Sequence, residues 1–510
     1  MSALATGSCP AQLPSDALNV EPALQADFLT DEPSIVPSVA LPPLMDAPTE
    51  LPPLHRVDQA AMPHDNLAAA PSEPQQARVS VESVPPPSSL TQAEVRQALR
   101  LSTIEGAVAN VHLAITGAIG GSVFLTGFAV LLGANSLHIG MLGALPFIGQ
   151  LTQFVAAYLE DRFGHRRRLV LTGTLVGRLI WAALLTLPFL ALTEDTRLLT
   201  FFALLACSYA ANGIAGNAWL SWMSDLVPPR RRGSYFGIRN TVATLSAMIT
   251  TFLAGLTIDH FRLQGREATG YAFIFAVAVL AAIGAALLIH RQAEPPVQPK
   301  PRMRLTKMFS APFQERPFRS FVMANVGWAL VTGIASPFFF AYGLTVLGIS
   351  FSTLSLTVIV TSAVSLIFNP LVGRLQDTVG SRLVLVGCML GTVPLPLAWV
   401  VATPTNLFPI WLAAIFTGVF WPGLTQGLAN VLMERAPAAH RGSAIAGYGA
   451  VTGFGTLIAG LIGGSLALWF AQIHLSLGMV TVTGLAFLFL LTSLGRIFMA
   501  AVFWRTLASP

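Results

Sequence analysis

Long apolar stretches dominate this chain from residue 101 onward and constrain its fold more than any other feature. A helix that crosses a lipid bilayer needs about 20 mostly apolar residues. Twelve stretches meet this requirement: 104–132, 137–159, 168–191, 198–224, 234–258, 270–290, 319–346, 352–372, 383–403, 405–433, 444–470 and 476–496. The sequence therefore predicts an all-α membrane protein with twelve transmembrane helices.

The charge of the chain is divided unevenly. Residues 1–95 hold 12 acidic residues, 2 basic residues and 16 prolines, whereas the remainder holds 27 basic and 12 acidic residues. The first part cannot bury enough apolar surface to fold alone, so we expect a disordered cytoplasmic tail. Basic residues in the membrane part are explained by membrane topology, so we expect a lipid bilayer and no nucleic acid as a partner.

The loops between the apolar stretches predict the orientation. With the tail inside the cell, the inner loops carry 18 Lys and Arg residues and the outer loops carry three. Inner loops of membrane proteins carry an excess of positive charge. Both termini are therefore expected to be cytoplasmic.

A ten-residue pattern, acid-x-x-Pro-x-x-x-Arg-Gly-Ser, occurs twice. One copy begins at Asp225 and includes Arg232, and the other begins 209 residues later at Glu434 and includes Arg441. Two copies of one charged loop indicate a duplicated membrane unit. We expect both copies on the cytoplasmic side.

The longest connection after the tail divides the apolar stretches six and six. It lies at 291–318 and contains several basic residues and prolines. The predicted organisation is a tail over 1–95, a six-helix bundle over 96–291, a cytoplasmic loop over 292–318 and a second six-helix bundle over 319–510.

A second duplicated signature, Asp-x-x-Gly-x-Arg, joins the second and third stretches of each half. The glycine permits a tight left-handed turn, and the aspartate can pair with an arginine of a neighbouring loop when the inner mouth closes. We predict a cytoplasmic gate made by both kinds of loop. Its residues are Asp161, Arg162, Gly164, Arg166, Asp225, Arg232, Asp377, Gly380, Arg382, Glu434 and Arg441.

Residues 96–510 resemble the major facilitator superfamily. The resemblance rests on the twelve stretches, the long central loop and the signature Gly-x-Leu-x-Asp-Arg-x-Gly-Arg-Arg in both halves. The copies are imperfect, with Ala157 and His165 in the first and Thr378 in the second. The segments 102–106 and 219–225 look like a bacterial branch of the superfamily.

The resemblance implies two pseudo-symmetric six-helix bundles in the bacterial inner membrane. It implies a transporter of a small molecule rather than an enzyme, without a cofactor or metal, and we expect a monomer. The fifth stretch has a single glycine, Gly255, and no proline. It therefore lacks the run that is usual in drug–proton antiporters of the superfamily.

Ionisable residues at membrane depth are costly and mark candidate functional sites. The first half has Glu105, His112, Arg178 and Arg239. The second half has none before Arg496, which we place at the inner end of the last stretch. We therefore expect the coupling chemistry in the first half.

Glu105 and His112 are seven residues apart and so share one helix face. Histidine titrates near neutral pH, which makes a proton relay along this helix one interpretation. The other is structural: Glu105 caps the helix end and His112 forms a hydrogen bond with a neighbouring helix.

Arg178 lies ten residues into the third stretch, near the middle of the bilayer. Its partner is either an anionic substrate or the pair Asn212 and Asn217. Because the third helix usually supports the bundle in the superfamily, we favour a tie between helices. Arg239 could reach the membrane surface, pair with Glu105 or bind anions at the inner mouth.

Further polar and aromatic residues suit a substrate with ring or hydroxyl groups. Trp421 and Gln426 lie 13 and 8 residues before Glu434. Asn212 and Asn217 lie at the same distances before Asp225. Hydrogen bonding between helices is the alternative for each of them. These candidates are Asn325, Trp328, Trp421 and Gln426.

These features predict a secondary active transporter that works by alternating access and is coupled to protons. The chain has no nucleotide-binding Gly-x-x-x-x-Gly-Lys-Ser/Thr run, so an ion gradient should supply the energy. The alternative is a receptor or assembly factor that does not transport and docks through its N-terminal tail.

Overall fold

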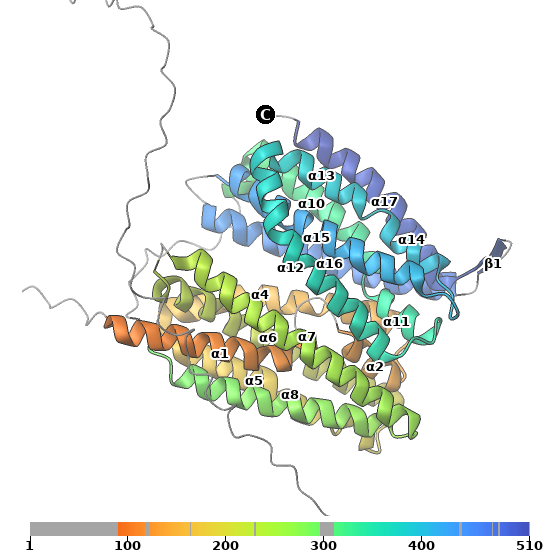
Figure 1. The fold of residues 1–510 in the computed structure, drawn as a ribbon, viewed down its shortest axis with the longest axis horizontal. Helices are drawn as coiled ribbons and strands as arrows, with labels where there is room; N and C mark the ends of the chain where they lie inside the picture. Colours follow the sequence, from red (N-terminus) through yellow and green to blue (C-terminus); the bar gives the residue numbers. More distant parts are fainter. Residues whose placement is uncertain are drawn as a thin grey trace, which may run out of the picture. The chain divides into compact units, whose positions relative to one another are not determined.

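The computed structural model describes residues 90–117, 122–163, 165–228, 231–295, 311–437, 441–471, 473–477 and 480–508. Nearly all of the predicted tail and most of the central loop lie outside these ranges. The described part is almost entirely helical (Figure 1).

The first half runs from α1 to α8. Its elements are α1 Gln92–Thr116, α2 Val123–Leu131, α3 Ser136–Ala144, α4 Pro146–Phe163, α5 Arg166–Leu184, η1 Leu187–Phe189, α6 Glu194–Leu226, α7 Arg232–Leu263 and α8 Glu267–His290.

The second half runs from η3 to α17. Its elements are η3 Ala311–Gln314, α10 Arg316–Ala335, α11 Phe338–Thr345, α12 Phe351–Val379, α13 Ser381–Gly391, α14 Pro394–Val401, α15 Phe408–Arg435, α16 Arg441–Phe470, β1 His474–Leu477, β2 Val480–Thr483 and α17 Gly484–Thr506.

Ten helical segments in the described ranges are long and apolar enough to cross a membrane. The first two predicted spans are each built from two helices, α1 with α2 and α3 with α4. With these, every predicted span has a counterpart. The predicted all-α membrane fold of two six-helix bundles is confirmed.

Two details of the prediction were wrong. The first stretch is not one continuous helix, because α1 ends at Gly117, whose left-handed backbone (φ 67°) caps it. The last span does not begin at 476, because residues 474–477 and 480–483 pair as antiparallel strands. The second strand reads Val-Thr-Val-Thr, and β-branched residues favour an extended backbone.

The shift of the last helix relocates Arg496. This residue lies in the middle of α17, not at its inner end, and is 4% exposed. Its Nη1 donates to the backbone oxygen of Thr392, between α13 and α14, at 2.6 Å. The second half therefore also contains a deeply buried cation.

The start of α1 is fixed by a capping box between Thr91 and Glu94. The backbone N–H of Thr91 donates to Glu94 Oε2 at 2.8 Å, and its hydroxyl donates to the same oxygen at 2.9 Å. These hydrogen bonds, the backbone one most strongly, lower the pKa of the Glu94 carboxyl. The helix thus begins at Gln92, inside the predicted tail, which was expected to end at residue 95.

The two bundles pack against each other at the end where α7 finishes and α12 begins, which we call the distal end. The opposite end, with the duplicated loops, is the proximal end. At the distal end α3 lies against α16 through glycines. A Cβ added to Gly140 would lie 2.3 Å from the carbonyl oxygen of Gly460. Small residues of this kind let membrane helices approach closely.

A second distal contact joins α7 to α12. Both carboxylate oxygens of Asp259 accept backbone N–H groups at the start of α12, from Phe351 at 2.9 Å and Ser352 at 2.8 Å. An anion is favoured at a helix N-terminus because four backbone donors there lack helical partners. Asp259 thus fastens the first bundle to the second.

Replacing Gly140 by alanine should destabilise the distal contact, because the added methyl group would overlap a backbone oxygen that cannot rotate away. We expect a loss of about 1–3 kcal/mol in the free energy of unfolding, measured by denaturant titration of the purified protein. Gly216→Ala is the matched control, since nothing lies within 4 Å of its added Cβ. Equal stability of the two variants would contradict this packing.

Candidate functional site

Arg166 joins the two kinds of duplicated loop in the first half. Its Nε lies 2.6 Å from Glu160 Oε1, and its Nη1 lies 2.6 Å from Asp225 Oδ2. Ser221 also donates its hydroxyl hydrogen to Glu160. The Arg166 side chain is 1% exposed, so α4, α5 and α6 are held together by a buried guanidinium with two carboxylates.

The second half lacks this arrangement, because the neutral Gln376 takes the place of Glu160. Gln376 and Asn430 occupy the positions equivalent to Glu160 and Ser221, and Asn430 Nδ2 donates to Gln376 Oε1 at 2.5 Å. With no carboxylate at 376, the Arg382 guanidinium lies over the Trp504 ring, 4.1 Å from its centroid. It also donates to the Trp504 backbone oxygen at 2.8 Å.

The remaining gate candidates have separate positions. Arg232 Nη2 donates to the backbone oxygen of Ser224 at 2.6 Å, near the end of α6. Glu434 accepts a hydrogen bond from Ser381 at 3.4 Å, and Gly380 has the expected positive φ, 93°. Asp377 is exposed. The side chains of Asp161, Arg162 and Arg441, and all of Gly164, lie outside the described part.

Glu105 and Arg239 form a buried ion pair between α1 and α7. Glu105 Oε2 lies 3.1 Å from Arg239 Nη2, and Arg239 Nε donates to the backbone oxygen of Ser102 at 3.2 Å. The guanidinium also lies over the Trp219 ring, 4.3 Å from its centroid. A Cβ at Gly106 would lie 3.0 Å from Arg239 Cζ, so the glycine leaves room for the cation.

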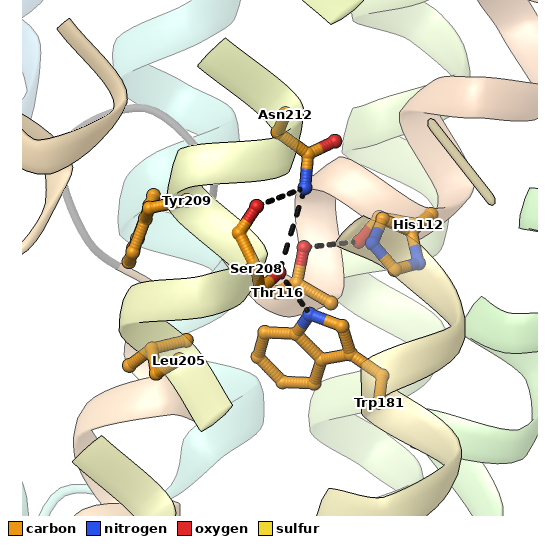
Figure 2. A pocket seen from close by; sticks show the side chains of 7 residues that line it. All are labelled: His112, Thr116, Trp181, Leu205, Ser208, Tyr209 and Asn212. Carbon is orange, nitrogen blue, oxygen red and sulfur yellow. Dashed lines mark hydrogen bonds between the residues drawn. The ribbon is translucent and has the colours of Figure 1, made fainter. Parts of the chain in front are cut away.

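A small pocket lies between α1, α5 and α6 (Figure 2). Its volume of about 10 Å³ corresponds to about one water molecule. Neutral polar groups dominate its wall. The lining residues are His112, Thr116, Trp181, Leu205, Ser208, Tyr209 and Asn212.

Ser208 is the centre of the hydrogen bonds in this wall. Its hydroxyl accepts from Trp181 Nε1 at 3.2 Å and donates to the backbone oxygen of Gly177 at 2.5 Å. Asn212 Nδ2 donates to the Ser208 backbone oxygen at 2.9 Å. The two hydrogen bonds of the Ser208 hydroxyl hold α5 against α6 and fix the indole at the pocket (Figure 2).

His112 is buried and has a defined tautomer. Its Nδ1 lies 3.1 Å from the backbone oxygen of Ala278 on α8. A carbonyl oxygen only accepts, so Nδ1 carries a hydrogen and Nε2 is the remaining site for a proton. The imidazole packs edge-on against Trp181 at 6.0 Å between ring centroids.

Arg178 lies one turn before Trp181 on α5 and is 8% exposed. Its Nε and Nη1 have no hydrogen-bond partner among the residues that the structure describes. These two guanidinium nitrogens therefore make no hydrogen bond to Asn212, whose amide nitrogen donates to the Ser208 backbone oxygen within α6. Asn217, the other suggested partner, lies further along α6.

The candidates in the second half do not gather at one point. Asn325 Nδ2 donates to Tyr448 Oη at 2.7 Å, and Gln426 Nε2 donates to Asn369 Oδ1 at 2.9 Å. These bonds join α10 to α16 and α15 to α12. Trp328 packs in the core of the second bundle, and Trp421 is 39% exposed.

Five of the seven pocket residues were not among the predicted candidates: Thr116, Trp181, Leu205, Ser208 and Tyr209. Neutral side chains in an apolar stretch carry no charge that would single them out. Glu160 could have been identified from the sequence, because it is a carboxylate at the position that Gln376 occupies in the other copy of the loop. Asp259 was also missed, because it lies beyond the end of the predicted fifth stretch.

The family model described as Major Facilitator Superfamily matches residues 111–347 and 330–500, which is most of the chain. The chain belongs to the Major Facilitator Superfamily. It is accordingly a multi-pass membrane protein, and membership of this superfamily supports a transporter rather than an enzyme.

Solved structures of superfamily transporters share this fold. The nucleoside transporter NupG has a TM-score of 0.60 at 12% identity, over 82% of this chain and 99% of that one. A bacterial homolog of the human lysosomal transporter Spinster, inward-facing and occupied, has a TM-score of 0.62 at 14% identity, over 82% and 98%. The D-xylose–proton symporter has a TM-score of 0.60 at 16% identity, over 81% and 98%.

At these identities the likeness shows the fold alone. No curated protein matches the sequence.

Proposed function

We propose that this protein is a secondary active transporter that moves a small molecule by alternating access, driven by a proton gradient. The observation that carries the proposal is the difference between the two ends of the bundles. At the distal end Asp259 and the glycines of α3 and α16 join the two halves. At the proximal end the ion pairs of Arg166 lie within the first half.

This arrangement is one of the two states that alternating access requires. The basic loops predict that the proximal end faces the cytoplasm, so the described state would be closed toward the outside. The proposed location is the bacterial inner membrane, with both termini cytoplasmic and bundles over 96–291 and 319–510. In this reading the Arg166 cluster holds the first half rigid while the halves move.

Proton coupling is proposed to use His112. Its Nε2 is the free nitrogen of a buried imidazole beside a cavity that holds about one water molecule. Glu105, seven residues away on the same helix, is paired with Arg239 and could exchange that partner during the cycle. The D-xylose–proton symporter shows that this fold accommodates proton coupling.

Replacing His112 by alanine should abolish solute accumulation driven by a pH gradient while leaving solute exchange across the membrane intact. The reason is that exchange needs the conformational change but no net proton movement. Both activities are measured in proteoliposomes with the purified variant. His260→Ala is the control, because His260 is exposed at the distal end of α7. Unchanged coupling in His112→Ala would exclude His112 as the proton site.

A further inference from the structure

We propose that Arg178 binds an anionic group of the transported molecule, so that the substrates are small carboxylates or phosphates. This inference rests on the proposed function, because it names the substrate class of the same first-half site. It follows from the burial, the missing partners and the surroundings of one guanidinium.

Arg178 is a buried arginine of the first bundle that forms no ion pair among the residues that the structure describes. It is 8% exposed, and its Nε and Nη1 lack hydrogen-bond partners among the described residues. By contrast, Arg166 is paired with Glu160 and Asp225, and Arg239 is paired with Glu105. A buried charge without a partner is strongly unfavourable. A ligand that supplies the missing negative charge would remove this cost.

Polar groups of α6 lie close to the segment of α5 that carries Arg178. The neighbouring Gly177 touches Asn212 of α6 so closely that an added Cβ would lie 2.5 Å from Nδ2. Trp181, one turn further along α5, and Ser208 of α6 form part of the wall of the pocket (Figure 2). Arg178 does not itself line this pocket, whose volume corresponds to about one water molecule. A carboxylate or phosphate would therefore reach the guanidinium only when the helices around the pocket move apart, as alternating access requires.

Arg496 shows what a structural buried arginine looks like in this chain. It is 4% exposed in the second bundle, and its Nη1 donates to the backbone oxygen of Thr392 at 2.6 Å, where α13 ends, while its Nε has no partner among the described residues. Its hydrogen bond ties two elements of one bundle together. Arg496 is therefore the matched control for a substitution at Arg178.

The test compares purified wild-type protein with Arg178→Met, Arg178→Lys and Arg496→Met. Thermal unfolding is followed with inorganic phosphate, acetate, succinate or benzoate, and with choline as a cation control. A ligand that binds the folded state raises the midpoint. We expect at least one anion to raise it by roughly 2–5 °C in the wild type, Arg178→Lys and Arg496→Met, but not in Arg178→Met.

The midpoints without ligand separate a binding role from a structural one. Arg178→Met should unfold at the wild-type temperature or above it, because methionine removes an unpaired buried charge. Arg496→Met should unfold at a lower temperature, because its hydrogen bond is lost. A lower midpoint for Arg178→Met would indicate a structural tie and overturn the proposal.

The same protein in proteoliposomes distinguishes this inference from the proposed function. Anion stabilisation that depends on Arg178, without movement of any solute, would support the anion site and refute transport. The absence of stabilisation by any of the four anions, or equal stabilisation of Arg178→Met, would overturn the anion site. Transport of a neutral or cationic solute in that case would leave the proposed function standing.

Discussion

Replacing Arg166 by methionine should lower the free energy of unfolding by about 3–5 kcal/mol. The substitution leaves Glu160 without its cation, and the Glu160 side chain is 11% exposed. Water therefore cannot replace the lost partner. Asp225 contributes less to the loss, because its side chain is 42% exposed and can be solvated.

The equivalent substitution in the second half provides the control. Arg382→Met removes a guanidinium that lies over Trp504 and donates to a backbone oxygen, with no buried carboxylate beside it. We expect a loss of about 1 kcal/mol. Both variants are compared by denaturant unfolding in the same detergent. Equal losses would show that the ion pairs of Arg166 stabilise the protein no more than the contacts of Arg382 do.

Replacing Asp259 by asparagine should weaken the contact between the two bundles at the distal end. The amide has one acceptor oxygen and no charge, whereas the carboxylate accepts two backbone N–H groups at the start of α12. Charge-assisted hydrogen bonds of this kind contribute about 1.5–3 kcal/mol. The population ratio of the described state to its alternative should therefore fall about tenfold or more.

Spin labels at each end would report this shift. Labels at Leu263 and Val346 mark the distal end, and labels at Arg168 and Thr378 mark the proximal end; all four side chains are exposed. In Asp259→Asn the distal distance should lengthen and the proximal distance should shorten, as measured by double electron–electron resonance. Glu267→Gln is the control, because Glu267 pairs with Arg262 inside the first bundle. Unchanged distances in Asp259→Asn would show that the Asp259 contact with α12 does not hold the distal end closed.

Most of the fold could be predicted because the bilayer imposes a length on every spanning helix. Twelve apolar stretches and two duplicated loops were enough to give the number of spans and their division into halves. The errors arose where an apolar stretch is not one helix. Gly117 ends α1 inside the first stretch, and the β-branched residues 480–483 extend the chain before α17. Hydrophobicity alone does not distinguish these local conformations.

The candidate site was predictable only where charge marked it. Glu105 and Arg239 were suggested as partners, and the structure places them 3.1 Å apart. Trp181 and Ser208 are neutral and were not distinguishable from ordinary interior residues. Their hydrogen bond depends on how α5 lies against α6, which the sequence of either helix does not determine.

Solute flux in proteoliposomes tests the central claim most directly. Purified protein is reconstituted, a pH gradient is imposed without ATP, and uptake of radiolabelled carboxylates, phosphates, nucleosides, sugars and quaternary amines is measured. We expect at least one solute to accumulate above its external concentration and to leak back when a protonophore collapses the gradient. Failure of every solute to move in either direction, by a protein whose folded state is verified by its thermal unfolding, would contradict the proposed transport function.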